Sequence, residues 1–357
     1  MKKSLIALAV LATAGVASAQ SSVTLFGIVD ATLAFGKGDT TDRTQLTNSG
    51  YNSSRLGFRG TEDLGGGMSA SFWLEAGLAN DDGQGAATNS NNQLSGTGAA
   101  VAGRQGLTFN RRSTVSLAGG WGEVRLGRDY TPQFWNLTVF DPFGTNGVGT
   151  TATLISGQAN TDPVTIRASN SIGYFLPGNL GGFYGQAQYY MGENPSQPSA
   201  NEDDGSGGGV RVGFASGPFN VAGAFSRTNF AAGDFKTWNV GGQWDFGFAK
   251  LMGHYVDHRV EGPAIDLHGK GWLIGGLVPV GAGEIRLAYS TYDYGVASAE
   301  VKKYALGYVH NLSKRTAVYA TYAHLSNDGA VALGLNGAVT PAGNSSSGFD
   351  LGIRHSF

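Results

Sequence analysis

Apolar and polar residues alternate over short segments of this chain, and this period-two pattern restricts the possible folds more than any other feature. Residues 23–35, for example, place valine, leucine and phenylalanine on one face and Thr24, Asp30 and Thr32 on the other. Such alternation is typical of β-strands whose two faces meet different environments. Similar patterns recur over residues 55–62, 69–78, 238–246 and 284–290. The alternation therefore predicts an all-β protein.

Short glycine-rich turns and longer, mostly polar connections separate these segments in alternation. Glycine supplies the positive φ angles that tight hairpins need. Seven turns are predicted, at residues 63–67, 119–122, 177–182, 216–218, 245–247, 279–283 and 311–315. Eight longer connections are predicted near residues 36–52, 80–107, 130–165, 192–206, 229–235, 259–268, 295–299 and 326–347. Seven turns and eight loops join sixteen antiparallel strands, and both chain ends then lie on the turn side.

Sixteen strands with short turns at one rim and long loops at the other are typical of a transmembrane β-barrel of an outer membrane. The first and last strands can pair and close such a barrel, and sixteen strands leave an aqueous channel inside. The chain has 58 glycines and no cysteine, so the predicted barrel depends on its hydrogen-bond ladder and packing rather than on disulfides.

The first 19 residues have the properties of a secretory signal peptide. Met1-Lys2-Lys3 precede an apolar run over residues 5–16, and Ala17-Ser18-Ala19 place small residues at the cleavage site. We expect cleavage before Gln20, which leaves residues 20–357 as the barrel of a protein exported to the outer membrane of a Gram-negative bacterium. Without two of its 24 basic residues, Lys2 and Lys3, the chain carries 22 basic against 26 acidic residues. This balance gives no basic face for nucleic acid.

One long connection, residues 130–166, is far more apolar than a solvated loop. Loops of this length are usually functional or disordered, and an apolar composition argues against disorder. Its charged residues are Asp141 and Asp162. Its large apolar residues are Phe134, Trp135, Leu137, Val139, Phe140, Phe143, Val148, Leu154 and Ile155. We predict that this third external loop folds inward and narrows the channel, which makes it the candidate functional site.

Several stretches resemble the general porins of β-proteobacteria and Neisseria. They are residues 22–30 (SVTLFGIVD), 54–67 (SRLGFRGTEDLGGG), 111–117 (RRSTVSL), 122–129 (GEVRLGRD), 307–315 (GYVHNLSKR) and 352–357 (GIRHSF). The resemblance implies a homotrimer of sixteen-stranded barrels through which small hydrophilic solutes diffuse passively. It also implies a preference for small anions. The partners expected of such a protein are these solutes, membrane lipid and lipopolysaccharide, and two further copies of the chain.

The resemblance implies an arginine cluster on one wall of the constriction, facing acidic residues. Matched motif by motif, the arginines are Arg55, Arg111 and Arg167, and the acidic partners are Glu75 and Asp141.

Strand parity gives a separate prediction for the charged residues of the wall. It places on the lumen face Arg55, Arg59, Glu75, Arg125 and Arg167. Parity sends Arg112 inward and Arg111 outward, so the resemblance requires a bulge or a twist at the strand end, and both residues remain candidates. Arg59 and Arg125 are secondary candidates, since Glu62, Asp63 and Glu123 could neutralise them. The arginines could also serve only to satisfy polar groups within the wall.

A barrel enzyme, such as an esterase or protease, is the alternative function, and a structural or adhesive barrel is another. A hydrolase needs an oriented histidine that activates a nucleophile. His254 and His258 share a strand face, but Asp257 points away from them, so we expect neither a catalytic group nor a metal site there. The sequence contains no nucleotide-binding glycine motif between a strand and a helix, and we expect no cofactor. An adhesive barrel would not need an apolar loop inside.

Overall fold

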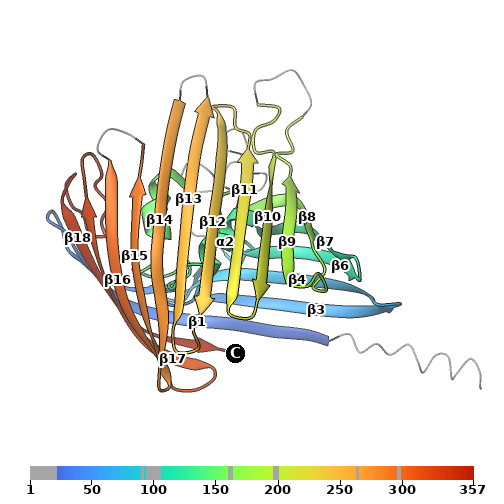
Figure 1. Ribbon diagram of the computed structural model, residues 1–357, viewed down its shortest axis with the longest axis horizontal. Coiled ribbons are helices and arrows are strands. Elements are labelled where there is room, and N and C mark those ends of the chain that lie inside the picture. The colour runs from blue at the N-terminus through green and yellow to red at the C-terminus, as the bar shows by residue number, and fades with distance from the viewer. Residues whose placement is uncertain are drawn as a thin grey trace, which may run out of the picture.

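The sequence folds into a closed antiparallel β-barrel in a computed structural model that describes residues 22–89, 92–93, 106–159, 164–195, 201–262, 265–295 and 299–357 (Figure 1). Each wall strand pairs with its neighbours along the chain, and β1 pairs with β18 from Ile28↔Ser356 to Lys37↔Ser347. Sixteen strands form the wall, which confirms the predicted fold class.

The wall strands in chain order are β1 (Ser22–Lys37), β3 (Arg55–Gly65), β4 (Met68–Ala79), β6 (Arg112–Gly119), β7 (Gly122–Tyr130), β8 (Arg167–Phe175), β9 (Phe183–Tyr190), β10 (Gly207–Ser216), β11 (Phe219–Thr228), β12 (Asp234–Asp245), β13 (Lys250–Gly262), β14 (Ile265–Val280), β15 (Gly283–Asp293), β16 (Glu300–Asn311), β17 (Thr316–Asn327) and β18 (Ser345–Ser356). Two short strands, β2 (Arg43–Asn48) and β5 (Gln84–Gly85), lie in the connections after β1 and β4.

All seven predicted turns lie where the structure has short connections between wall strands. One predicted loop is wrong. Residues 259–268 belong mostly to β13 and β14, whose hydrogen-bonded register continues to Gly262↔Ile265. Two charged residues of this stretch, Arg259 and Asp266, form an ion pair 3.5 Å apart between these paired strands.

The wall follows the predicted alternation. Its outer face carries half-exposed apolar side chains such as Leu126, Val210 and Leu306, whereas inward positions carry buried polar ones such as Ser116 and Asn239. This pattern suits a barrel with lipid outside and water inside. The wall is also uneven in height: β10–β14 stand nearly upright, and β1, β3 and β4 lie almost flat in the same view (Figure 1).

Two short helices occupy the connection between β7 and β8, where the sequence predicted an inward loop. They are α2 (Pro132–Val139) and α3 (Ala152–Ala159). Proline at the first position of α2 suits a helix start, because its fixed φ is helical and its missing N–H would have no partner there. None of the described helices is long and apolar enough to cross a membrane.

Candidate functional site

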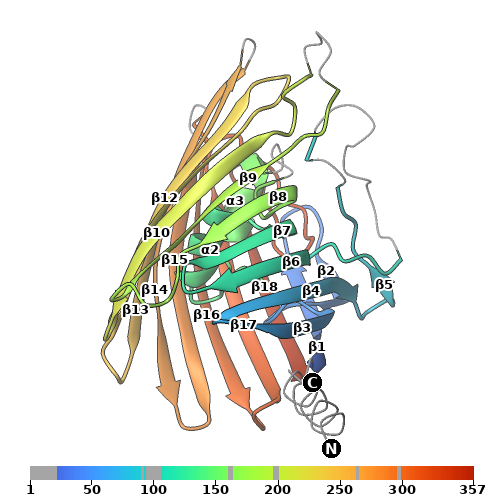
Figure 2. The ribbon, with the colours of Figure 1, turned by 90° about the vertical axis from the view of Figure 1, so that its right-hand side faces the viewer.

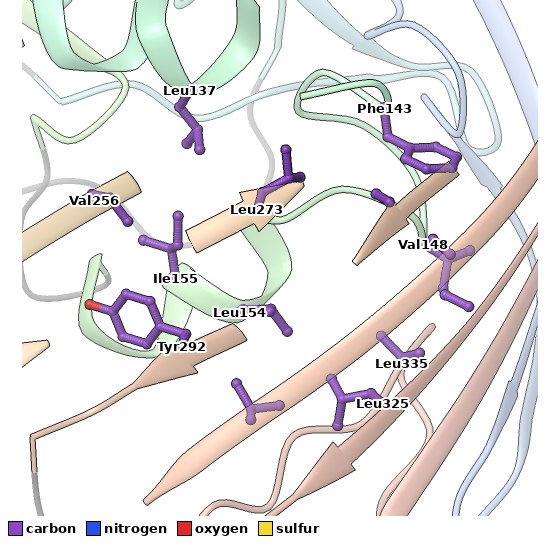
Figure 3. Close-up of a cluster of buried hydrophobic side chains, with 14 of the residues drawn as sticks. Leu137, Phe143, Val148, Leu154, Ile155, Val256, Leu273, Tyr292, Leu325 and Leu335 are labelled. Carbon is purple, nitrogen blue, oxygen red and sulfur yellow. The ribbon is translucent and has the colours of Figure 1, made fainter. Parts of the chain in front are cut away.

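The loop between β7 and β8, called the constriction loop below, lies inside the barrel. Helix α2 packs on the inner side of β9–β12, and α3 packs on β15 (Figure 2). Its apolar side chains share one buried cluster with inward-facing wall residues such as Val256, Leu273 and Leu325 (Figure 3). The loop members of the cluster include Phe134, Leu137, Phe143, Val148, Leu154 and Ile155. The predicted inward fold of the loop is therefore confirmed. Its physical cause is the burial of these side chains, because burial of each large apolar side chain stabilises the folded state by about 1.5–3 kcal/mol.

Glycines on the inner face of the wall make room for this loop. A β-carbon at Gly241 on β12 would lie 2.2 Å from the ring of Phe140, and one at Gly348 on β18 would lie 2.4 Å from Val148. Gly275 on β14 and Gly307 on β16 are approached in the same way by Pro142 and Phe143, at 2.7 and 2.9 Å. These positions explain part of the high glycine content that lies outside the turns.

Buried polar groups fix the loop to the wall. Lys303 on β16 is 1% exposed and donates to the carbonyls of Val148, at 3.2 Å, and of Thr150. Asp350 on β18 accepts the Val148 N–H at 2.8 Å. At the other end, Arg211 on β10 donates to Asn136 of α2 at 2.5 Å. Loss of one partner from such a set leaves a buried charge without compensation, so these contacts restrict the loop to one position.

Asp141 lies inside the loop rather than on the cavity wall. Its two carboxylate oxygens accept the backbone N–H groups of Phe143 and Thr151, both at 2.8 Å, and its exposure is 4%. Burial raises the pKa of Asp141 above its ordinary value, while the two backbone N–H groups oppose that rise. The expectation from the sequence placed this carboxylate opposite the arginines. In the structure it instead shapes the turn between α2 and α3.

A cavity of about 360 Å³ remains between the constriction loop, the wall and the segment 51–53 that precedes β3. Three arginines line it, namely Arg55, Arg111 and Arg286, and no carboxylate is among its lining residues within the described chain. The remaining lining residues are Tyr51, Asn52, Ser53, Tyr130, Phe134, Trp135, Thr138, Phe143, Gly144, Thr145 and Asn146.

Four of the predicted site residues converge on Tyr130, at the end of β7. Arg111 donates to its hydroxyl at 2.7 Å, and Arg167 donates to it at 2.9 Å with its guanidinium 4.4 Å from the ring centroid. Glu75 accepts from Arg111 at 2.6 Å and from Arg55 at 3.3 Å. We call these five residues the Tyr130 cluster. It contains three arginines and one carboxylate, so it carries surplus positive charge.

The two adjacent arginines of the RRSTVSL stretch point to different places. Arg111 immediately precedes β6 and therefore escapes strand parity, and its side chain joins the Tyr130 cluster. Arg112 begins β6, lies 4.6 Å above the Trp73 ring and 3.8 Å from Asp129, and does not line the cavity.

The secondary candidates also lie outside the cavity lining. Arg125 pairs with Asp129 at 2.5 Å and with Glu123 at 3.0 Å, as the sequence suggested for Glu123. Arg59 stacks over Phe26 and Trp73, at 5.4 and 5.1 Å from their ring centroids.

Several residues of the site are not among those predicted from the sequence. The predictions from the sequence use Tyr130 only as the first residue of the loop and do not include Tyr51. Arg286 lies on the polar face of the predicted strand segment 284–290, and strand parity directs it into the lumen, but it is not among the predicted site residues. Lys303 has the same parity signal, but its partners are loop carbonyls that only the tertiary structure brings near.

The histidines weighed for catalysis are buried behind the constriction loop. His258 shares a hydrogen bond of 2.9 Å with the Tyr292 hydroxyl, and His254 lies on the same face of β13. Within the described ranges, no group of three or more histidine, aspartate or glutamate side chains could hold a metal ion.

Comparison with known proteins agrees with this architecture. Residues 4–330 match a protein-family profile described as Gram-negative porin. Outer membrane porin protein 32 of Delftia acidovorans is 40% identical over 373 aligned positions, which cover 100% of both chains. The solved structure of an anion-selective porin from Comamonas acidovorans superposes with a TM-score of 0.82 at 37% identity, over 95% of this chain and 100% of its own. A trimer form of OmpT from Vibrio cholerae shares the fold, with a TM-score of 0.66 at 15% identity over 94% of this chain and 99% of its own.

Proposed function

The chain belongs to the Gram-negative porin family, and from that membership we propose that its channel through the outer membrane prefers anions among the small hydrophilic solutes it passes. One observation carries the preference: three arginines and no carboxylate are found among the described residues that line the cavity beside the constriction loop. An ion sheds part of its hydration where a channel is narrowest, and low-dielectric walls focus the field there. The name of the Comamonas relative points the same way.

The site residues of this proposal are those of the Tyr130 cluster. Arg55 and Arg111 line the cavity and attract the anion, and Glu75 orients both of them. Arg167 is not a lining residue and adds its charge from its place beside Tyr130, which accepts hydrogen bonds from Arg111 and Arg167. Arg112 and Arg125 are offset by Asp129 and Glu123, and Arg59 stacks on aromatic rings, so we assign these three arginines to the wall outside this cavity. The role of Asp141 is to shape the constriction loop. In this assignment the net acidic charge of the whole chain matters little, because exposed charges act weakly beyond a Debye length of about 8 Å.

Membership of the family also supports three proposals about the protein in the cell. Residues 1–19, which lie outside the described residues, act as a signal peptide. The barrel assembles as a homotrimer, and the outer membrane protein OmpT, which shares its fold, has a trimer form. Its outer wall contacts membrane lipid and lipopolysaccharide. Native mass spectrometry in mild detergent tests the trimer, and exclusively monomeric mass would reject it.

The protein acts as a passive channel rather than as a barrel enzyme. The apolar constriction loop and the arginine-lined cavity account for the site without a nucleophile.

The decisive experiment is single-channel recording of the purified protein in a planar bilayer. In a tenfold KCl gradient, the reversal potential should shift from zero toward the equilibrium potential of chloride. A potential on the potassium side would reject the anion preference while leaving the porin fold intact. The absence of any conductance from correctly folded protein would reject the channel itself.

A further inference from the structure

A second tyrosine of the cavity, Tyr51, also contacts two arginines, Arg286 and Arg354. These three residues lie outside the Tyr130 cluster. The guanidinium of Arg286 on β15 lies 4.5 Å from the ring centroid of Tyr51 and donates to its hydroxyl at 3.1 Å. The guanidinium of Arg354 on β18 lies 5.2 Å from the same centroid. We call Tyr51, Arg286 and Arg354 the Tyr51 group. The cavity of about 360 Å³ is lined by both tyrosines and by Arg286.

Buried contacts hold Tyr51 in place. Asp30 on β1 is fully buried and accepts the backbone N–H groups of Tyr51 and Asn52, at 2.9 and 2.6 Å. The same carboxylate accepts the hydroxyl of Tyr319, whose ring lies 5.6 Å from that of Tyr51. The tyrosine is therefore fixed before any solute arrives, and a site held in this way loses little entropy when it binds a ligand.

The Tyr51 group contains two arginines, and a carboxylate lies near each of them. Arg286 pairs with Glu284 at 3.0 Å, and Asp30 lies directly opposite Arg354 in the register of β1 and β18, although Arg354 makes no ion pair with any described residue. Arg354 uses one nitrogen to donate to Ser356 at 2.6 Å, and its buried Nε has no hydrogen-bond partner. Both guanidinium groups stack on one ring, so they lie within about 10 Å of each other, and an anion beside this ring is near both charges.

We propose that the Tyr51 group is a second anion-binding site of the channel, specific for a single carboxylate, phosphate or sulfate group. Arginine presents N–H donors in a planar fork that matches such oxyanions, and an anion between the two guanidinium groups relieves their mutual repulsion. Tyr51 is a positioning residue, and Arg286 and Arg354 contact the anion. This inference rests on the proposed anion preference, which already counts Arg286 among the arginines of the cavity, and adds to it Arg354 and the class of oxyanion that is bound.

Because the two groups share no residue, their effects on selectivity should be additive, as for independent sites. Residues within the Tyr130 cluster should behave differently, since Arg55 and Arg111 share Glu75. Additivity therefore distinguishes a second site from an extension of the first.

The experiment measures reversal potentials in a KCl gradient for the full-length protein and for Arg354→Gln, Arg354→Lys and Tyr51→Leu. Arg315→Gln is the matched control, because Arg315 is an exposed arginine in the turn between β16 and β17. A second measurement titrates inorganic phosphate against the chloride current. Resistance of each barrel to unfolding in detergent confirms that the variants are folded.

Arg354→Gln should lower the chloride-to-potassium permeability ratio about two- to threefold, the effect of one unit charge acting across several ångström of water. It should also raise the phosphate concentration that halves the current. Arg354→Lys should restore most of the permeability ratio, and Tyr51→Leu should weaken phosphate inhibition with both arginines still present. In the double variant with Arg167→Gln and Arg354→Gln, the permeability ratio should fall by the product of the two single-variant reductions.

A wild-type channel that prefers chloride, together with an Arg354→Gln variant no different from Arg315→Gln, would overturn the second site and leave the proposed function standing. A wild-type channel that prefers potassium would overturn both. Loss of selectivity without any change in phosphate inhibition would reduce the Tyr51 group to a contributor to the general field, and would also overturn the proposal.

Discussion

Arg167→Glu is the substitution that most directly tests how the constriction selects ions. Arg167 has no acidic partner among the described residues, and its guanidinium is held by the Tyr130 hydroxyl and ring. A glutamate at this position would place a negative charge next to Arg111, which already pairs with Glu75. The net charge of the Tyr130 cluster would fall from plus two to zero.

The size of the effect can be estimated from Coulomb's law. A unit charge about 8 Å from the permeating ion contributes roughly 0.5–1 kcal/mol, if the water in the cavity keeps the effective dielectric between about 40 and 80. Reversal of one charge counts twice, so the change is about 1–2 kcal/mol. Since about 1.4 kcal/mol corresponds to a factor of ten, and the same charge acts with opposite sign on potassium, the chloride-to-potassium permeability ratio should fall at least tenfold.

The assay is the reversal potential in a KCl gradient, recorded at low and at high salt. Arg167→Gln should give about half the shift on a logarithmic scale, and Arg315→Glu, at the exposed turn, should give little. The shifts should shrink as salt rises, because screening shortens the range of each charge. An Arg167→Glu channel with the wild-type reversal potential would refute the assignment of selectivity to the Tyr130 cluster.

Three further substitutions test how the constriction loop is held. Lys303→Met removes the buried cation that bonds the Val148 and Thr150 carbonyls, so it should destabilise the loop contact by about 3–5 kcal/mol and give noisier, larger single-channel currents; quiet wild-type currents would contradict this. Gly241→Val should force Phe140 away from β12 at a cost of about 1–3 kcal/mol, which would lower the temperature at which the barrel unfolds in detergent. Gly223→Val is the control, because a β-carbon there meets no atom closer than 3.8 Å. Asp141→Asn should loosen the turn it caps by about 1–3 kcal/mol and raise current noise, with little change in reversal potential; a large shift toward anions would show that the carboxylate faces the permeating ion after all.

The barrel could be predicted from the sequence because its determinants are local. Alternation fixes which side chains face lipid, and glycine marks the hairpins, so all seven turns were located correctly. The exception at residues 259–268 has a physical cause. Charged residues such as Arg259 and Asp266 resemble loop residues in sequence, but here they lie on paired strands.

The site was less predictable because its determinants are not local. The inward position of the constriction loop followed from its uncovered apolar surface, but its two short helices depend on packing against the wall and left no clear periodicity. Parity placed Arg167 and Glu75 on the lumen face. It could not decide Arg111, which precedes its strand, or reveal that backbone N–H groups 2 and 10 residues away would occupy both oxygens of Asp141.

The pairing of the first and last strands has a consequence for how this chain reaches its folded state. Ile28 on β1 meets Ser356 on β18, and the backbone of Phe357 exchanges two hydrogen bonds of 3.1 Å with Gly27. Contacts between residues so distant in sequence carry a high cost in chain entropy and slow folding. Until β18 arrives, β1 and β17 are open edges that can pair with other chains. The last dozen residues therefore close the barrel. Only after they have paired are the edges of β1 and β17 covered, so we expect the chain to be most prone to aggregation before this step.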